Sequence, residues 1–160
     1  MNKKTLDLTR ASLIAALYVV LTIIANLAGM ASGAIQLRLS EMLTILPVFT
    51  WAAVPGLTLG CVIANLVTGC ALWDIVFGSF ATFLGALGTY YIGKKKPVLG
   101  PIAPILCNML IVPKVLQLVY GAEDAYLYLV ATVGVGEILS CGLLGLILYN
   151  VLKKTDIFDK

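Results

Sequence analysis

The chain has 160 residues, of which 61% are hydrophobic and 12% are charged, and its formal net charge at pH 7 is +3. Soluble domains carry about 25% charged residues, so this composition and the mean hydropathy of +1.02 exclude an ordinary soluble domain. The sequence therefore indicates an integral membrane protein. We expect residues 1–160 to form a single transmembrane domain.

Apolar segments along the chain predict six membrane-spanning helices, and each span requires roughly 20 apolar residues. In chain order the segments are 11–30, 41–51, 55–68, 74–92, 99–120 and 125–152. The second and third segments are short, since 15 helical residues reach only about 22 Å. A re-entrant hairpin is therefore the alternative to two thin spans. The predicted fold class is an all-α integral membrane bundle of six transmembrane helices.

The orientation of the bundle follows from three clusters of basic residues, which share one side of the membrane if there are six spans. The clusters are Lys3, Lys4 and Arg10; Lys94, Lys95 and Lys96; and Lys153, Lys154 and Lys160. The positive-inside rule makes this side cytoplasmic, together with both termini. Arg38 and Lys114 are left on the outer side or within the membrane, where charged residues usually serve a function.

Two other features of the sequence have simpler explanations. The basic N-terminus and the apolar run ending in MASGA would also fit a cleavable signal peptide. That run is long for a signal peptide, and nothing downstream resembles a secreted soluble domain, so a first membrane helix is favoured. The four cysteines lack the spacing of metal ligands, and we interpret them as small core residues: Cys61, Cys70, Cys107 and Cys141. No metal site is expected.

The stretch IQLRLSEMLTILP, residues 35–47, combines an extended segment with the start of a helix. Apolar and polar residues alternate up to Ser40, which is typical of an extended segment with one polar face. We expect Ser40 to cap the following helix, with Glu41 in its first turn. Gln36 and Arg38 would then lie on an outer loop over the bundle. Either Arg38 and Glu41 form an ion pair that fixes the loop, or at least one of them contacts a ligand.

Further polar residues fall in the outer halves of the later segments. Asn65 lies in an apolar run and needs hydrogen-bond partners, whereas Asp74 could either face a pocket or cap its own helix. Lys114 and Glu137 lie about 9 Å and 18 Å below the outer ends of their helices. A carboxylate at that depth requires a partner, a proton or a cavity. A Lys114 to Glu137 bridge is the structural alternative.

These residues together predict a pocket that opens outward, with Tyr120 and Tyr126 near its rim. The candidate binding residues are Gln36, Arg38, Glu41, Asn65, Trp73, Asp74, Asn108, Lys114 and Glu137. Carboxylates, amides and aromatic rings suit a small planar heterocycle with several hydrogen-bond donors better than they suit a bare ion or a lipid.

Small residues recur at helical spacing in two segments. In the first, Ala11 and Ala15 are four residues apart, as are Ser12 and Ala16. This spacing allows close helix approach, either to a partner protein, which we favour, or within the chain. In the fourth segment a stripe of small residues is expected to pack inside the chain: Gly78, Ala81, Gly85 and Gly88.

The sequence gives no sign of an enzyme. Residues 88–95, GTYYIGKK, match the spacing of a phosphate-binding loop, but Lys95 stands where Ser or Thr would bind magnesium. The chain contains no histidine, so the commonest general base is absent. No cofactor is expected. Uphill transport would therefore require an ion gradient or a partner that hydrolyses ATP.

Three segments carry a resemblance to a known family: IQLRLSEMLTILPVF, PGLTLGCVIANL and WDIVFGSFATFLGAL. With the alanine-rich first helix, they make the chain from about Arg10 to Leu152 resemble the QueT family of queuosine precursor transporters. The resemblance implies a substrate-binding S component of an energy-coupling factor (ECF) transporter in the bacterial plasma membrane. Such a six-helix bundle captures a vitamin or related metabolite outside and docks on one transmembrane coupling protein and two ATPase subunits.

The resemblance also implies roles for particular residues. Ala11 and Ala15 would contact the coupling protein, and the loop around Gln36 and Arg38 would act as a lid. The implied substrate is a 7-deazaguanine base or queuine, and no nucleic acid is implied as a partner. Which carboxylate holds the base stays open among Glu41, Asp74 and Glu137.

Two other functions remain as alternatives to an S component. One is a self-sufficient proton-coupled transporter in which Glu137 binds the proton. The other is a membrane assembly subunit without a ligand, whose outer polar residues would pair only with one another.

Overall fold

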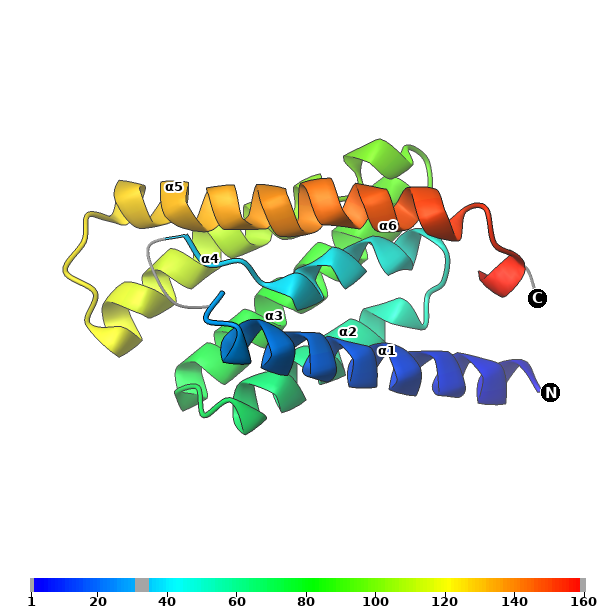
Figure 1. Cartoon of the computed structure of the whole chain (residues 1–160), viewed down its shortest axis with the longest axis horizontal. Helices are drawn as coiled ribbons and strands as arrows, with labels where there is room; N and C mark the ends of the chain where they lie inside the picture. Colours follow the sequence, from blue (N-terminus) through cyan, green and yellow to red (C-terminus); the bar gives the residue numbers. More distant parts are fainter. Residues whose placement is uncertain (1, 31–34, 159–160) are drawn as a thin grey trace.

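The computed structural model describes residues 2–30 and 35–158, and this part of the chain is helical with no strand. In chain order the elements are α1 (Lys3–Leu27), η1 (Leu39–Val48), α2 (Ala53–Val67), α3 (Leu72–Gly88), η2 (Thr89–Gly93), η3 (Pro97–Leu99), α4 (Ile102–Tyr120), α5 (Tyr126–Glu137), η4 (Ile138–Leu144), α6 (Gly145–Leu152) and η5 (Asp156–Phe158). Successive spans run in alternate directions along one long axis, with α5, η4 and α6 continuing as one helix, and both termini lie at the same end of the bundle (Figure 1). The predicted all-α membrane bundle is confirmed.

Four helical segments of the described chain are long and apolar enough to cross a membrane: Lys3–Leu27, Leu72–Gly93, Pro97–Tyr120 and Tyr126–Leu152. The other two helices are the short pair that the sequence predicts, with 10 residues in η1 and 15 in α2. At their rises per residue both reach only about 20 Å. Neighbouring helices bury most of η1, whereas α2 buries one face and exposes Leu59, Leu66 and Val67 on the other.

The short helix η1 lies in the interior of the bundle, where it contacts α1, α6 and η4. Most of its side chains are buried: Ser40, Glu41, Leu43, Thr44, Ile45, Leu46 and Pro47. Its N-cap is Arg38, and no side chain caps the helix. The predicted cap by Ser40 is wrong because the Ser40 hydroxyl instead accepts a hydrogen bond from Thr22 Oγ1 of α1 at 2.9 Å.

Small residues bring α1 and α2 into backbone contact. A Cβ added at Gly56 would lie 2.7 Å from the Ala11 carbonyl oxygen, and one at Gly60 would lie 3.0 Å from the Ala15 Cα. Ala11 and Ala15 therefore face α2 within this chain. The stripe that α1 exposes contains Ser12 and Ala16 instead.

Gly85 and Gly88 of α3 pack against α4, whereas Gly78 faces Asn65 of α2. A Cβ at Gly85 would lie 2.7 Å from the Cα of Pro104, and Gly88 approaches Ala103 equally closely. The internal packing predicted for this stripe is confirmed. Because backbone contacts backbone, α3 and α4 are held as one unit.

The two ends of the chain meet at the predicted cytoplasmic end. Arg10 Nη2 donates to the Ile157 carbonyl oxygen at 3.2 Å, and the guanidinium lies 5.5 Å from the centre of the Phe158 ring. Phe158 also stacks on Phe49 with ring centres 5.2 Å apart. These contacts join the C-terminal segment to α1 and to the residue after η1. Lys160, the last residue of the predicted third basic cluster, lies outside the described residues.

The close contact at Gly85 gives a stability prediction. Gly85→Ala should lower the free energy of unfolding by about 1–3 kcal/mol, because the new Cβ has to displace the backbone of Pro104. Gly142→Ala is the matched control, since its Cβ would meet side-chain atoms only at 3.9 Å. Thermal unfolding of both variants in detergent checks this, and equal melting temperatures would contradict it.

Candidate functional site

A cavity of about 380 Å³ is lined by residues at the end of the bundle opposite the termini. It is formed where the end of α1, the segment before η1, the end of α2, the start of α3 and the end of α4 come together. The lining residues are Tyr18, Thr22, Ala25, Asn26, Gln36, Arg38, Ser40, Asn65, Thr68, Cys70, Asp74, Leu116 and Tyr120. Most of them carry a polar group, unlike the surrounding apolar helix surfaces.

Asp74 lines one side of the cavity, and hydrogen bonding holds its carboxylate in place. The Tyr120 hydroxyl donates to Asp74 Oδ2 at 2.9 Å and accepts from the Ala71 amide at 3.1 Å. This arrangement ties the end of α4 to the start of α3, and Gly121 then ends α4 in a left-handed conformation, with φ of 67°. The alternative of Asp74 as a helix cap is not realised, because the N-cap of α3 is Ala71. Asp74 Oδ1 accepts no hydrogen bond from another described residue.

A cation lies across the same cavity. Arg38 is partly buried and lines it beside Gln36. Within residues 2–30 and 35–158, its guanidinium forms neither a hydrogen bond nor a salt bridge, so the alternative ion pair with Glu41 is not formed. Burial disfavours its charge, yet the phenol of Tyr18 and the surrounding carboxylates hold the pKa of Arg38 above the usual arginine range. Its donors are therefore charged and available to a bound molecule.

At the inner end of the cavity, a hydrogen bond joins α1 to η1. Glu41 is completely buried, and its Oε1 accepts from the Tyr18 hydroxyl at 2.5 Å. Because Tyr18 lines the cavity while Glu41 lies beneath it, the tyrosine couples the cavity to a deeper polar layer.

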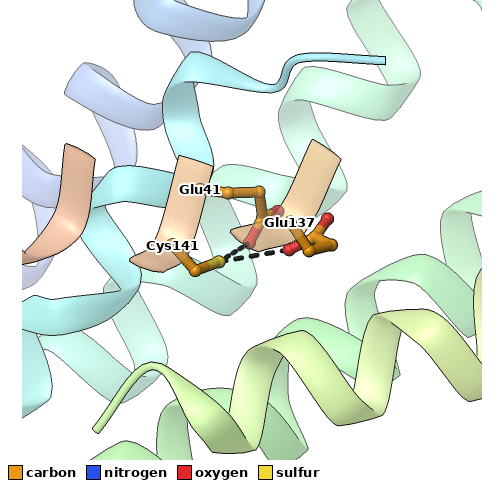
Figure 2. A group of neighbouring side chains, drawn as sticks. All are labelled: Glu41, Glu137 and Cys141. Atoms are coloured by element: carbon orange, nitrogen blue, oxygen red, sulfur yellow. Dashed lines mark hydrogen bonds between the residues drawn. The ribbon is translucent and has the colours of Figure 1, made fainter. Parts of the chain in front are cut away.

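That deeper layer brings two carboxyl groups together (Figure 2). Cys141 Sγ lies 3.1 Å from Glu137 Oε2 and 3.9 Å from Glu41 Oε2. The amide of Asn108 lies beside both carboxyl groups and is itself buried. One ligand atom from each of the three residues in Figure 2 lies within 4.8 Å of the others, a spacing that a metal ion could bridge. The donor set is enclosed, however, and Tyr18 and Cys141 already hydrogen-bond its oxygens.

Two predicted binding residues lie elsewhere. Trp73 is 58% exposed and stacks on Phe77, away from the cavity. Lys114 is exposed, and its Nζ lies 4.3 Å from the centre of the Tyr126 ring. The alternative bridge from Lys114 to Glu137 is not formed in the part of the chain that the structure describes. Both residues line a separate groove on the outer face of α3 and α4.

The nine predicted residues thus fall into three groups. Gln36, Arg38, Asn65 and Asp74 line the cavity; Glu41, Asn108 and Glu137 lie beneath it; and Trp73 and Lys114 lie outside it. Their roles in binding stay predictions.

Several residues of the site were not predicted from the sequence. Tyr18 and Asn26 are polar residues in the apolar first helix, a signal that could have been used. Cys141 follows Glu137 by four residues on one helix, and this spacing places the thiol beside the carboxylate.

Comparisons with known proteins agree on one family. Residues 8–154 match the family model described as QueT transporter. A curated relative from Lactococcus lactis subsp. cremoris (strain MG1363), named "Queuosine precursor transporter QueT", is 28% identical, and the match covers 98% of each chain. No solved structure matches the chain.

The Tyr18 hydrogen bond gives a second stability prediction. Tyr18→Phe should lower the free energy of unfolding by about 1–3 kcal/mol, because the buried Glu41 carboxyl loses its donor. Tyr128→Phe is the control, since Tyr128 is 49% exposed and its hydroxyl has no hydrogen-bond partner among the described residues. Thermal unfolding measures both, and an unchanged melting temperature for Tyr18→Phe would refute the role given to this bond.

Proposed function

Because this chain belongs to the QueT family of transporters, we propose that it binds a queuosine precursor, a 7-deazaguanine base or queuine, in the cavity between Asp74 and Arg38. The name of the Lactococcus relative supports this substrate class. The cavity of about 380 Å³ falls within the range of 300–1,000 Å³ that is usual for small-molecule sites. The observation that carries the proposal is an available carboxylate oxygen and an available guanidinium on one cavity.

The chemistry of the base matches these two groups. A guanine-like edge offers adjacent N–H donors, which the Asp74 carboxylate can accept, and a carbonyl oxygen, which Arg38 can bind. Gln36 and Asn65 add amide groups that donate as well as accept. The rings of Tyr18 and Tyr120 give the flat heterocycle apolar faces.

The buried layer beneath the cavity supports the site without touching the base. Glu41 holds the hydroxyl of Tyr18, and the nearby carboxyl groups attract the guanidinium of Arg38. In this proposal Asp74 is the carboxylate that binds the base. Glu41 and Glu137 are positioning residues.

Energy for uptake would come from partners. We propose that the chain is the S component of an ECF importer in the bacterial plasma membrane. It would dock on a transmembrane coupling protein with two ATPase subunits. The first helix remains the proposed docking element, but Ala11 and Ala15 already face α2. The exposed stripe of Ser12 and Ala16 is therefore the surface that a partner helix would meet.

A proton-coupled transporter is the second candidate, and one observation favours it. Glu137 is buried beside a second carboxyl group, Glu41, as a proton-binding site would be. Uptake that stops with a protonophore but persists when ATP is depleted would support this candidate and refute the S component.

The substrate claim is tested by calorimetric titration of the purified chain with a panel of 7-deazaguanine bases. Asp74→Asn should weaken binding at least tenfold, about 1.4 kcal/mol, because the amide presents a donor where the base needs an acceptor. Asp124→Asn, on the exposed loop before α5, should leave the affinity unchanged. If the folded wild-type chain binds no deazaguanine, the proposed substrate is wrong.

The docking claim is tested by placing bulk on α1. Ala16→Trp should abolish uptake and co-purification of the coupling protein while base binding is kept, because Ala16 is exposed. Ala15→Trp should instead unfold the chain or weaken base binding, since Ala15 is packed against Gly60. Leu143→Trp, on an exposed position of η4, is the control for bulk at a lipid-facing site. Unimpaired uptake by Ala16→Trp would rule out this stripe as the docking surface.

A further inference from the structure

A second concavity, the α3–α4 groove, lies on the outer face of these two helices and has a volume of about 550 Å³. It shares no lining residue with the cavity described above. Its lining residues are Trp73, Phe77, Leu110, Ile111, Lys114, Val115, Leu118 and Val119. Lys114 is the one charged residue in this lining, and the other residues are apolar or aromatic.

The ammonium of Lys114 has no anionic partner among the described residues. Its Nζ faces the ring of Tyr126 at 4.3 Å, and no carboxylate lies within salt-bridge distance. Lys114 is six residues before the end of α4 at Tyr120, which is about 9 Å along the helix axis. A cation this close to hydrocarbon is stabilised when its head reaches the polar headgroup region or an anion.

We propose that the α3–α4 groove binds an anionic phospholipid of the outer leaflet, with the phosphate on Lys114 and an acyl chain along the apolar walls. The charge of Lys114 complements a phosphate, and residues such as Phe77 and Leu110 match an acyl chain. Trp73 lines the same groove and the Tyr126 ring faces the lysine, and tryptophan and tyrosine are enriched at the depth of lipid headgroups. The site is separate from the proposed base-binding cavity and does not depend on it.

Other occupants fit this groove less well. A planar polar base would leave its hydrogen-bond groups unpaired against apolar walls, which is costly. A neutral lipid would fill the walls but, lacking net negative charge, would attract the ammonium less. The groove therefore selects a lipid by its headgroup charge.

The test is native mass spectrometry of the purified chain with phosphatidylglycerol, and with phosphatidylcholine of the same acyl chains. The wild-type chain should retain phosphatidylglycerol about fivefold better, the effect expected of one lysine near an anionic lipid. Lys114→Gln should remove this preference. Leu118→Trp should lower phosphatidylglycerol retention with the charge unchanged, because Leu118 is 82% exposed and its replacement fills the groove.

Two controls make the result specific. Lys94→Gln removes a lysine that also lies over a tyrosine ring, at 4.4 Å, but outside the groove. Leu127→Trp adds the same bulk at a residue that is 78% exposed and lies outside the groove lining. Both controls should keep the lipid preference. Equal retention of the two lipids by the wild-type chain, or an equal loss with Lys94→Gln, would overturn the proposal, and so would loss of base affinity in Lys114→Gln.

Discussion

The hydrogen bond from Tyr18 to Glu41 fixes the interior of this bundle, because a buried carboxyl group has to find its donors inside the protein. Lipid offers no hydrogen bonds, so polar groups at this depth are satisfied by neighbouring helices. Glu41 reaches α1 through Tyr18 and lies beside Cys141 of η4. A helix of only 10 residues is thereby attached to both sides of the bundle.

The distribution of charge around the cavity follows from this attachment. Because Tyr18 donates a hydrogen bond to Glu41, Arg38 does not form the ion pair with Glu41 that its sequence position suggests. Asp74 is held by Tyr120 through one oxygen, which leaves the other available. A cation and a carboxylate thus meet in one cavity without neutralising each other by direct contact, and a ligand with both donors and acceptors can bind between them.

The sequence predicted the helices well because apolar runs and turn residues mark the spans of a membrane protein directly. It predicted the site less completely, because the side of a helix that a residue occupies depends on its neighbours. Trp73 directly precedes Asp74, and successive helical residues point about 100° apart, so only Asp74 faces the cavity.

The packing of α1 and the direction of Lys114 could likewise not be predicted from the sequence. The pairs Ala11–Ala15 and Ser12–Ala16 have equal spacing, and only Gly56 and Gly60 of α2 decide which pair is covered. Pro113 interrupts the regular face of α4, so the direction of Lys114 could not be predicted. Part of the expected lid, residues 31–34, lies outside the described residues.

Helices α3 and α4 separate the polar cavity from the α3–α4 groove. On α4, Leu116 lines the cavity while Lys114 and Val115 line the α3–α4 groove. The two helices are held together at one end by the contact of Gly85 with Pro104 and at the other by the bond from Tyr120 to Asp74. A movement that admits a solute would have to break both if it separated these helices. The opposite side of the cavity is anchored as well, because the Leu37 amide donates to the Met30 carbonyl oxygen at 2.9 Å and the backbone of Gln36 packs closely on Gly136 of α5.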